Sequence, residues 1–248
     1  MPLTYTTNLG ILNKVRDGLA LRARRRIFEI FMQECNPNSN SLVADFGVSG
    51  HRSHPAHYFF EAMYPYRRNL TAIARASEGA HWLPDEFPGL TFLEADLRDI
   101  PLPDLYFDCG ICNAVVEHAG TSEQQARLVH EVCRVCRCVV FTTPNKWFPL
   151  DVHTMLPLLH WLPSAAYREV LQRIGLGYFS EIDNLNLLDR RTFLTLFPPS
   201  RQNVLRQLGP QCFATNLICI STAIAPLNCG LSRKSRATGG GQAQRAPG

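Results

Sequence analysis

Several short apolar segments of this sequence end in small, acidic or polar side chains. The first segment, residues 41–46, passes through Asp45 into a turn that contains Gly47, Ser49 and Gly50. Glycine lets the backbone adopt positive φ and approach a ligand closely, and an amide-rich turn suits polar or anionic groups. The turn therefore predicts a contact with a small polar ligand, although a plain strand-to-loop turn explains these residues equally well.

Later apolar segments end in a similar way. One segment ends at Asp96, the next continues into Asn113–His118, and another continues into Thr142–Phe148. Each ending has an ordinary explanation by itself: a turn residue, a surface histidine or core aromatic side chains. Because ligands of parallel α/β sheets bind beyond the carboxyl ends of the strands, the joint pattern predicts one ligand site at one edge of a sheet.

The order of strand and helix patterns predicts the elements that hold these residues. Strand-like runs alternate with helical spacing, which indicates βαβ units and a parallel sheet. Strands are predicted at 41–46, 69–74, 90–95, 107–115, 138–143, 203–208 and 215–223. Helices are predicted at 11–34 (one helix or two), 54–64, 122–136 with Ser122 as N-cap, 164–175, and 189–197 with Asp189 as N-cap.

The chain divides into three parts by composition. Residues 1–39 predict a helical segment that packs on the core, and residues 40–231 form the main domain with an insertion around 146–188. Residues 232–248 are rich in Gly, Arg and Ala without apolar periodicity, which predicts a disordered tail. The basic run Arg22–Arg26 is typical of a solvated helix face.

The bulk composition disfavours several classes of protein. The net charge of +4 is mild, and no broad basic face with interleaved aromatics is evident, so we expect no nucleic-acid partner. The first twenty residues lack a secretory pattern and no run of 18 apolar residues occurs, so we expect no membrane span. Nine cysteines, mostly inside apolar runs, indicate reduced thiols and a cytoplasmic location.

Two cysteine pairs have the spacing of a zinc site. Cys109 and Cys112 precede Cys133 and Cys136 by about twenty residues, which matches a four-cysteine zinc pattern. However, the first pair lies within a predicted strand, where residues three apart point to opposite faces. Free cysteine is also a common core residue. We therefore expect no metal, with a zinc site as the alternative.

Three familiar fingerprints are absent from the first turn. The dinucleotide pattern G-x-G-x-x-G fails because Ser49 stands in place of its second glycine. The nucleophile elbow G-x-S-x-G fails because Gly50 follows Ser49 directly. The letters DFG occur without the lysine strand and catalytic loop of a kinase.

Four ordered pieces resemble class I S-adenosylmethionine-dependent methyltransferases of the broad type-eleven group. They are VADFGVSG (43–50), LTFLEADLRDIPLPDLYFD (90–108), CNAVVEHAG (112–120) with its following helix, and CVVFTTPNKWFPLDVHT (138–154). The resemblance covers roughly residues 40–223. It implies a Rossmann-like α/β fold with a seven-stranded, mostly parallel sheet, helices on both faces and an antiparallel last strand. It also implies S-adenosyl-L-methionine as cofactor.

The resemblance assigns cofactor-binding roles to residues at the strand ends. They are Asp45, Gly47, Ser49 and Gly50 (methionine and ribose), Asp96 and Leu97 (adenine), and Asn113 and Ala114 (floor of the site). The family also has an acid at the end of its second strand that binds the ribose hydroxyls. Residues 74–77 offer no acid there, and Glu78 is the nearest one.

The resemblance also places the acceptor side of the site. Glu117 and His118 match a pair at the mouth, and His118 is the predicted catalytic base because histidine exchanges protons near neutral pH. Trp147, Phe148, His153 and the apolar 155–162 segment are predicted to wall an acceptor pocket, with a helix packed on the sheet as the alternative.

The leading prediction is methyl transfer to a small-molecule acceptor, with lipid- or sugar-linked molecules as the candidate acceptors. An alternative is a degenerate methyltransferase fold that binds a ligand or partner without turnover, which the weak second-strand end favours. A nucleotide-dependent oxidoreductase is disfavoured by the absent dinucleotide fingerprint.

Overall fold

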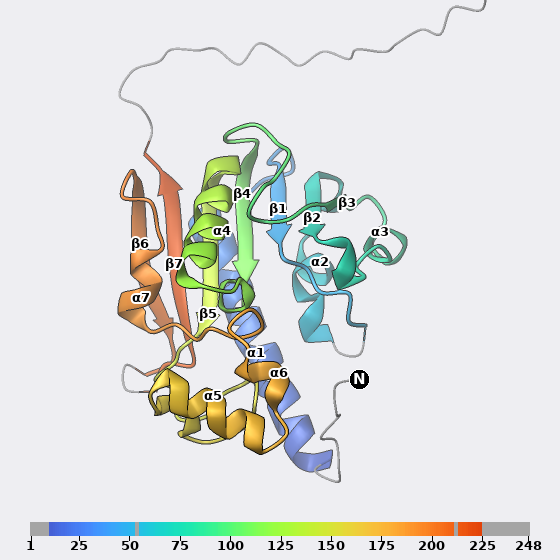
Figure 1. The fold of residues 1–248 in the computed structure, drawn as a ribbon. Helices are drawn as coiled ribbons and strands as arrows, with labels where there is room; N and C mark the ends of the chain where they lie inside the picture. Colours follow the sequence, from blue (N-terminus) through green and yellow to red (C-terminus); the bar gives the residue numbers. More distant parts are fainter. Residues whose placement is uncertain (1–9, 53–54, 211–212, 225–248) are drawn as a thin grey trace, which may run out of the picture.

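One seven-stranded sheet organises the chain (Figure 1). The structure is a computed structural model that describes residues 10–52, 55–210 and 213–224. The strand order is β3-β2-β1-β4-β5-β7-β6, and β7 is antiparallel to both of its neighbours, while β1 to β5 are parallel. The strands are β1 (Val43–Phe46), β2 (Leu70–Ala74), β3 (Thr91–Glu94), β4 (Phe107–Asn113), β5 (Cys136–Pro144), β6 (Arg201–Leu208) and β7 (Asn216–Ala223). This confirms the predicted fold class, including the antiparallel last strand.

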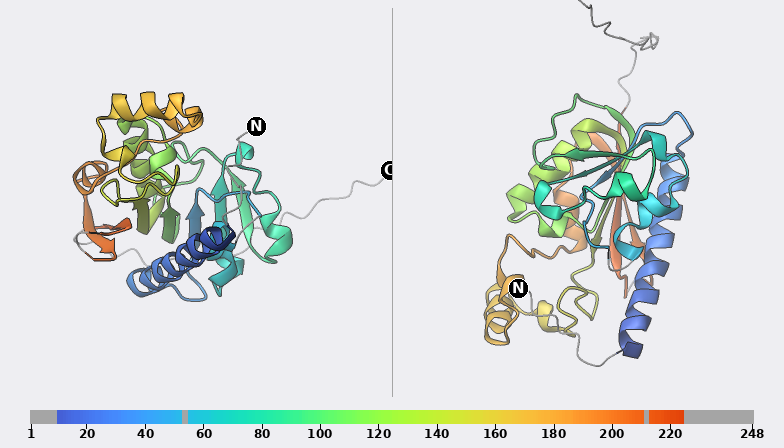
Figure 2. Two further views of the ribbon diagram at one scale, coloured as in Figure 1. Left: turned by 90° about the horizontal axis from the view of Figure 1, so that it is seen from below. Right: turned by 90° about the vertical axis from the view of Figure 1, so that its right-hand side faces the viewer.

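Helices cover both faces of the sheet (Figure 2). One face carries a core cluster that includes Ile27 and Phe31 of α1 with Phe59 and Phe60 of α2, and the other carries side chains of α4 and α7. The helices are α1 (Gly10–Cys35), α2 (Phe59–Met63), α3 (Leu83–Glu86), α4 (Ser122–Val135), α5 (Ser164–Arg173), α6 (Gly177–Ser180) and α7 (Arg190–Thr195). In this described part of the chain, no helix combines the length and apolarity needed to cross a membrane.

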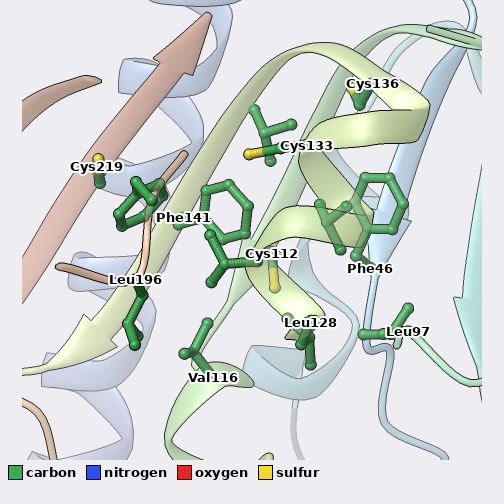
Figure 3. Close-up of a cluster of buried hydrophobic side chains, with 14 of the residues drawn as sticks. Phe46, Leu97, Cys112, Val116, Leu128, Cys133, Cys136, Phe141, Leu196 and Cys219 are labelled. Carbon is green, nitrogen blue, oxygen red and sulfur yellow. The ribbon is translucent and has the colours of Figure 1, made fainter. Parts of the chain in front are cut away.

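Figure 3 shows the cluster on the α4 face, where Phe46 and Phe141 pack with Leu128 and three of the cysteines of the zinc-like pattern. Those three, Cys112, Cys133 and Cys136, lie among apolar side chains on this face. Cys109 belongs to the cluster on the opposite face. The four thiols therefore do not converge on one ion, because alternate strand positions send Cys109 and Cys112 to opposite sides.

Three predicted helices differ in their details. The 11–34 pattern forms a single helix, and residues 54–64 form only the short α2 after a 3₁₀ turn (Pro55–His57). The difference lies at the start of α2, which begins at Phe59; its end at Met63 is close to the predicted one, and Tyr64, which precedes Pro65, is extended (ψ 124°) as expected before proline. The N-cap of α4 is Thr121 and the prediction of Ser122 was wrong, whereas Asp189 caps α7 as predicted.

The segment between β5 and α7 folds as short helices below the carboxyl ends of β4 and β5 (Figure 1). It contains a 3₁₀ turn (Leu159–Trp161), α5 and α6. In the view from below in Figure 2, α1 and the α5–α6 pair lie on opposite sides of the sheet edge. The edge of the sheet at which the parallel strands end is therefore flanked by α1 on one side and by the 146–188 segment on the other.

Candidate active site

The turn after β1 is held against the loops that follow β4 and β2. Gly47 has a φ of +88° and donates its amide to the Ile73 carbonyl at 2.8 Å. A Cβ on Gly47 would overlap the side chain of Val115, and one on Gly50 would overlap the backbone of Glu78. Both glycines are thus required by contacts within the protein, which bring three strand ends together.

The end of β4 is built around Asn113. Its Oδ1 accepts hydrogen bonds from Arg24 Nη1 at 2.5 Å and from Thr142 Oγ1 at 2.8 Å. The next residue, Ala114, has a φ of +54°, a conformation that costs a residue with a Cβ about 1–3 kcal/mol. Its amide donates to the Thr142 carbonyl at 2.9 Å. Strain of this kind gathers at ligand sites, which agrees with the predicted place of these residues.

Buried acidic side chains surround Arg24. Burial and the charge of Glu61 raise the pKa of Asp45 well above its usual range, while Arg24 acts to lower it. Burial also raises the pKa of Glu61 to about 7. Burial lowers the pKa of Arg24, and the charges of Glu117 and Asp45 oppose this. One guanidinium is therefore shared by two acids, Asp45 at the end of β1 and Glu117 beyond the end of β4.

The ends of β2 and β3 carry acids that already have arginine partners. Asp96 accepts two hydrogen bonds from the Arg98 guanidinium, at 2.7 and 3.0 Å, which lowers the pKa of Asp96 to about 2. Glu78 pairs with Arg75 at 3.2 Å, and both side chains are exposed. The second strand thus has no buried acid at its end, and Glu78 contacts the site through the backbone that packs on the Ser49–Gly50 turn.

Glu117, His118 and His153 meet beyond the end of β4. Glu117 is fully buried and its Oε2 accepts a hydrogen bond from Thr143 Oγ1 at 3.0 Å. The Nε2 atom of His153 lies 4.0 Å from Glu117 Oε1. The rings of the two histidines stack edge to face with centroids 4.9 Å apart. The structure therefore brings together the predicted base and two of the predicted acceptor residues.

Asp151 holds His153 and joins the 146–188 segment into one unit. Its carboxylate accepts hydrogen bonds from His153 Nδ1 (3.2 Å), Thr154 Oγ1 (2.7 Å) and Tyr167 OH (2.8 Å). Burial acts to raise the pKa of Asp151, but the bonds from His153 and Thr154 hold it well below its usual range. The hydrogen bonds within the segment therefore stabilise the ionised form of Asp151.

The two predicted aromatic residues have different surroundings. Trp147 is 50% exposed and its ring lies 6.2 Å from that of Trp161. Phe148 is partly buried, and its carbonyl accepts a hydrogen bond from His160 Nε2 at 2.8 Å. Of these two aromatic side chains, only Trp147 is exposed to solvent.

Sequence reasoning missed Arg24, Glu61 and Asp151. Arg24 was assigned to a solvated helix face, yet it continues the buried stripe of Ile27 and Phe31 at helical spacing, which is a usable signal. Glu61 and Asp151 acquire their surroundings from residues distant in the chain, so no local pattern marks them.

Comparisons with known proteins agree with the fold. Residues 53–138 match the family model described as a methyltransferase domain. None of the curated proteins matches the sequence. The fold resembles the N-methyltransferase NodS from Bradyrhizobium japonicum WM9 in complex with S-adenosyl-L-homocysteine, with a TM-score of 0.51 and 13% identity over 82% of this chain and 86% of that one.

Two further structures are similar. Magnesium protoporphyrin IX methyltransferase (ChlM) from Synechocystis PCC 6803, with bound S-adenosyl-L-homocysteine, gives a TM-score of 0.52 and 13% identity over 88% of this chain and 89% of that one. The small RNA methyltransferase HEN1 gives a TM-score of 0.52 and 15% identity over 81% of this chain, which spans only 25% of that chain. The match of residues 53–138 and these structural neighbours therefore agree on a methyltransferase fold.

Proposed function

From the fold and from the match of residues 53–138 to a methyltransferase domain, we infer that this chain is a class I S-adenosylmethionine-dependent methyltransferase. We propose that it transfers the methyl group to a small-molecule acceptor that carries an apolar, lipid-linked part. The sulfonium donor is already activated, so the protein's main task is to hold the acceptor in line with the methyl group.

The observation that carries the proposal is the group of buried acidic side chains around the ends of β1 and β4. Asp45 and Glu117 are buried at these ends, Glu61 of α2 is buried and acts on Asp45, and Arg24 is the cation that acts on Asp45 and Glu117. S-adenosylmethionine has a sulfonium and an ammonium group against one carboxylate, so it is a net cation. Opposite charge nearby favours the ionised form of buried acids, so a cationic ligand would stabilise this cluster.

The proposed roles follow the strand ends. The residues proposed to bind the cofactor are Asp45, Gly47, Ser49, Gly50, Glu78, Asp96, Leu97, Asn113 and Ala114. Glu117, Trp147, Phe148 and His153 are proposed to face the acceptor, with His118 as the catalytic base. Asp96 is ionised and keeps free lone pairs beside its arginine, whereas Glu78 is exposed and less suited to hold the ribose.

Exposed apolar side chains of the 146–188 segment support an apolar acceptor. Trp147, Met155, Leu158, Trp161 and Tyr178 are each 41–64% exposed. Contiguous exposed apolar side chains on a soluble fold mark binding surfaces for apolar ligands or partners. We propose that this segment and residues 1–39, whose described helix α1 flanks the same edge, complete the acceptor side of the 40–231 methyltransferase domain.

Calorimetric titration tests the cofactor. S-adenosylmethionine and S-adenosylhomocysteine are expected to bind at micromolar concentration, and NAD is expected to show no heat of binding. Binding of NAD instead would restore the oxidoreductase alternative.

Transfer of a labelled methyl group tests turnover. The labelled cofactor is incubated with the protein and, separately, with a lipid extract, a polar small-molecule extract and a short RNA. Label in the lipid fraction is expected. Label in RNA alone would overturn the small-molecule prediction, for which the RNA enzyme among the structural neighbours is the comparison. Cofactor binding with no label in any fraction favours the alternative of a binding protein without turnover.

A further inference from the structure

We propose that Glu117, His118 and His153 bind a divalent transition-metal ion at the mouth of the candidate active site. One ligand atom from each side chain lies within 4.8 Å of the other two. This differs from the sequence-based expectation of no metal, which was drawn from the cysteines. Glu117 and His118 are adjacent in the sequence, but His153 lies 35 residues after His118, so only the fold brings the three together.

Glu117 supplies the anionic ligand. It is fully buried, and its Oε1 has no hydrogen-bond partner, while Oε2 is satisfied by Thr143. A buried carboxylate oxygen without a partner is costly, and buried charges are normally paired or coordinate metals. Oε1 is also the oxygen that lies 4.0 Å from His153 Nε2. A cation between these two atoms would supply the missing partner.

Both histidines are oriented as metal ligands. The Nδ1 atom of His118 lies 2.7 Å from the Asn184 carbonyl oxygen, and the Nδ1 atom of His153 lies 3.2 Å from Asp151 Oδ1. Because a carbonyl and an ionised carboxylate only accept, each Nδ1 carries the hydrogen and each Nε2 keeps its lone pair. Metal-ligating histidines almost always donate their second nitrogen to such a partner.

The ligand types select the kind of ion. Two imidazoles and one carboxylate suit Zn²⁺, Fe²⁺, Co²⁺ or Mn²⁺, whereas Mg²⁺ and Ca²⁺ prefer oxygen ligands. Tetrahedral zinc at ~2.1 Å from each ligand sets the ligand atoms ~3.4 Å apart. Here Glu117 Oε1 and His153 Nε2 are 4.0 Å apart and the three ligand atoms lie within 4.8 Å of one another, so the side chains must move closer together to bind an ion. His118 is exposed, which leaves the remaining coordination position open toward the outside.

The catalytic consequence rests on the proposed function, but the metal site does not. A hydroxyl of the acceptor at the open position would lose its proton to water more readily. The S–CH₃ bond of the cofactor then breaks as the O–CH₃ bond forms, giving a methyl ether, S-adenosylhomocysteine and one released proton. In this arrangement His118 is a ligand, which replaces its proposed role as the base.

Metal titration without cofactor or acceptor tests the proposal. Protein stripped with EDTA is titrated with Zn²⁺ and Mn²⁺ by calorimetry, and Co²⁺ is followed by its visible absorption. One ion per chain is expected. His118→Ala and Glu117→Gln are expected to weaken binding by at least about tenfold. His130→Ala, an exposed histidine of α4, is the matched control and is expected to bind as the unaltered protein does.

His118 is exposed, so its variant is expected to fold, and circular dichroism verifies this. Absence of stoichiometric binding at millimolar metal, or equal binding by His118→Ala and the control, overturns the proposal. Titration of S-adenosylhomocysteine into the same samples separates the two inferences. If the unaltered protein binds S-adenosylhomocysteine but no metal, the metal site alone is rejected, and if it binds metal but no S-adenosylhomocysteine, the proposed function alone is rejected.

Discussion

At the residue scale, Arg24 is the positive charge that stabilises the ionised forms of the buried acids Asp45 and Glu117. It donates to Asn113 and attracts Asp45 and Glu117. We expect Arg24→Gln to lower the free energy of unfolding by about 2 kcal/mol, because it removes a charged hydrogen-bond donor and leaves buried acids to repel one another. Urea unfolding measures this. Arg25→Gln, on the exposed side of α1, is the control and should change stability by less than about 0.5 kcal/mol.

Glu61 makes stability depend on pH. Its pKa rises to about 7 in the folded state because it is buried, against a value of 4.5 without burial. The folded state therefore holds a proton that the unfolded state has lost between these values, and stability falls as pH rises through this window. The expected loss from this group between pH 4 and pH 8 is about 3 kcal/mol.

Glu61→Gln tests this assignment. The amide has the shape of the protonated acid and does not ionise, so stability of the variant should change less between pH 4 and pH 8. Urea midpoints at several pH values measure the difference. Glu169→Gln, an exposed acid of α5, should leave the profile of the unaltered protein in place. An unchanged profile in Glu61→Gln would falsify the assignment of the pH dependence to this carboxyl group.

Residues at strand ends were predictable, but their partners were not. Asp45, Asn113 and Glu117 each follow an apolar run, so the sequence indicated that they share one edge. The partner of Asn113 is Arg24, 89 positions earlier, and His153 Nε2 faces Glu117 Oε1 at 4.0 Å. Such pairs depend on where α1 and the 146–188 segment pack, and local spacing carries no information about that packing.

At the element scale, α4 begins with a capping box. Thr121 accepts a hydrogen bond from the Gln124 amide, and the Gln124 side chain accepts one from the Thr121 amide. We expect Thr121→Ala to destabilise the protein by about 1 kcal/mol, since an unsatisfied helix amide results. Ser122→Ala is the control because Ser122 is exposed and does not cap. Equal effects of the two substitutions in urea unfolding would contradict the assignment of the cap.

The N-caps of α4 and α7 show how far neighbouring residues alone can predict where a helix begins. Asp189 was predicted as a cap, and its side chain does accept from the Thr192 amide at 2.8 Å; no other capping residue lies beside it. Thr121 and Ser122 are adjacent and chemically alike. The choice between them depends on Gln124 reaching back to the first of the two, which a one-residue shift would break.

At the scale of the whole molecule, the alternation of strands and helices was enough to predict the sheet. What it did not predict is how the 146–188 segment is anchored. That segment has no strand of the sheet, and one buried carboxylate in it, Asp151, accepts from donors at 153, 154 and 167. Arg168 adds hydrogen bonds to the carbonyls of Ser180 and Leu185. The segment is therefore expected to open locally when this carboxylate is altered, while the sheet remains folded.

Asp151→Asn tests this independence of the segment from the sheet. The amide cannot accept all the hydrogen bonds of the carboxylate, so at least one buried donor loses its partner, at a cost of about 2 kcal/mol. Backbone amides of residues 151–167 should then exchange hydrogen about 30-fold faster in EDTA-treated protein. Amides of β1, β4 and β5 should keep their protection, and Glu169→Gln in the same segment should match the unaltered protein. Faster exchange throughout the sheet would show instead that the segment and the sheet unfold as one unit.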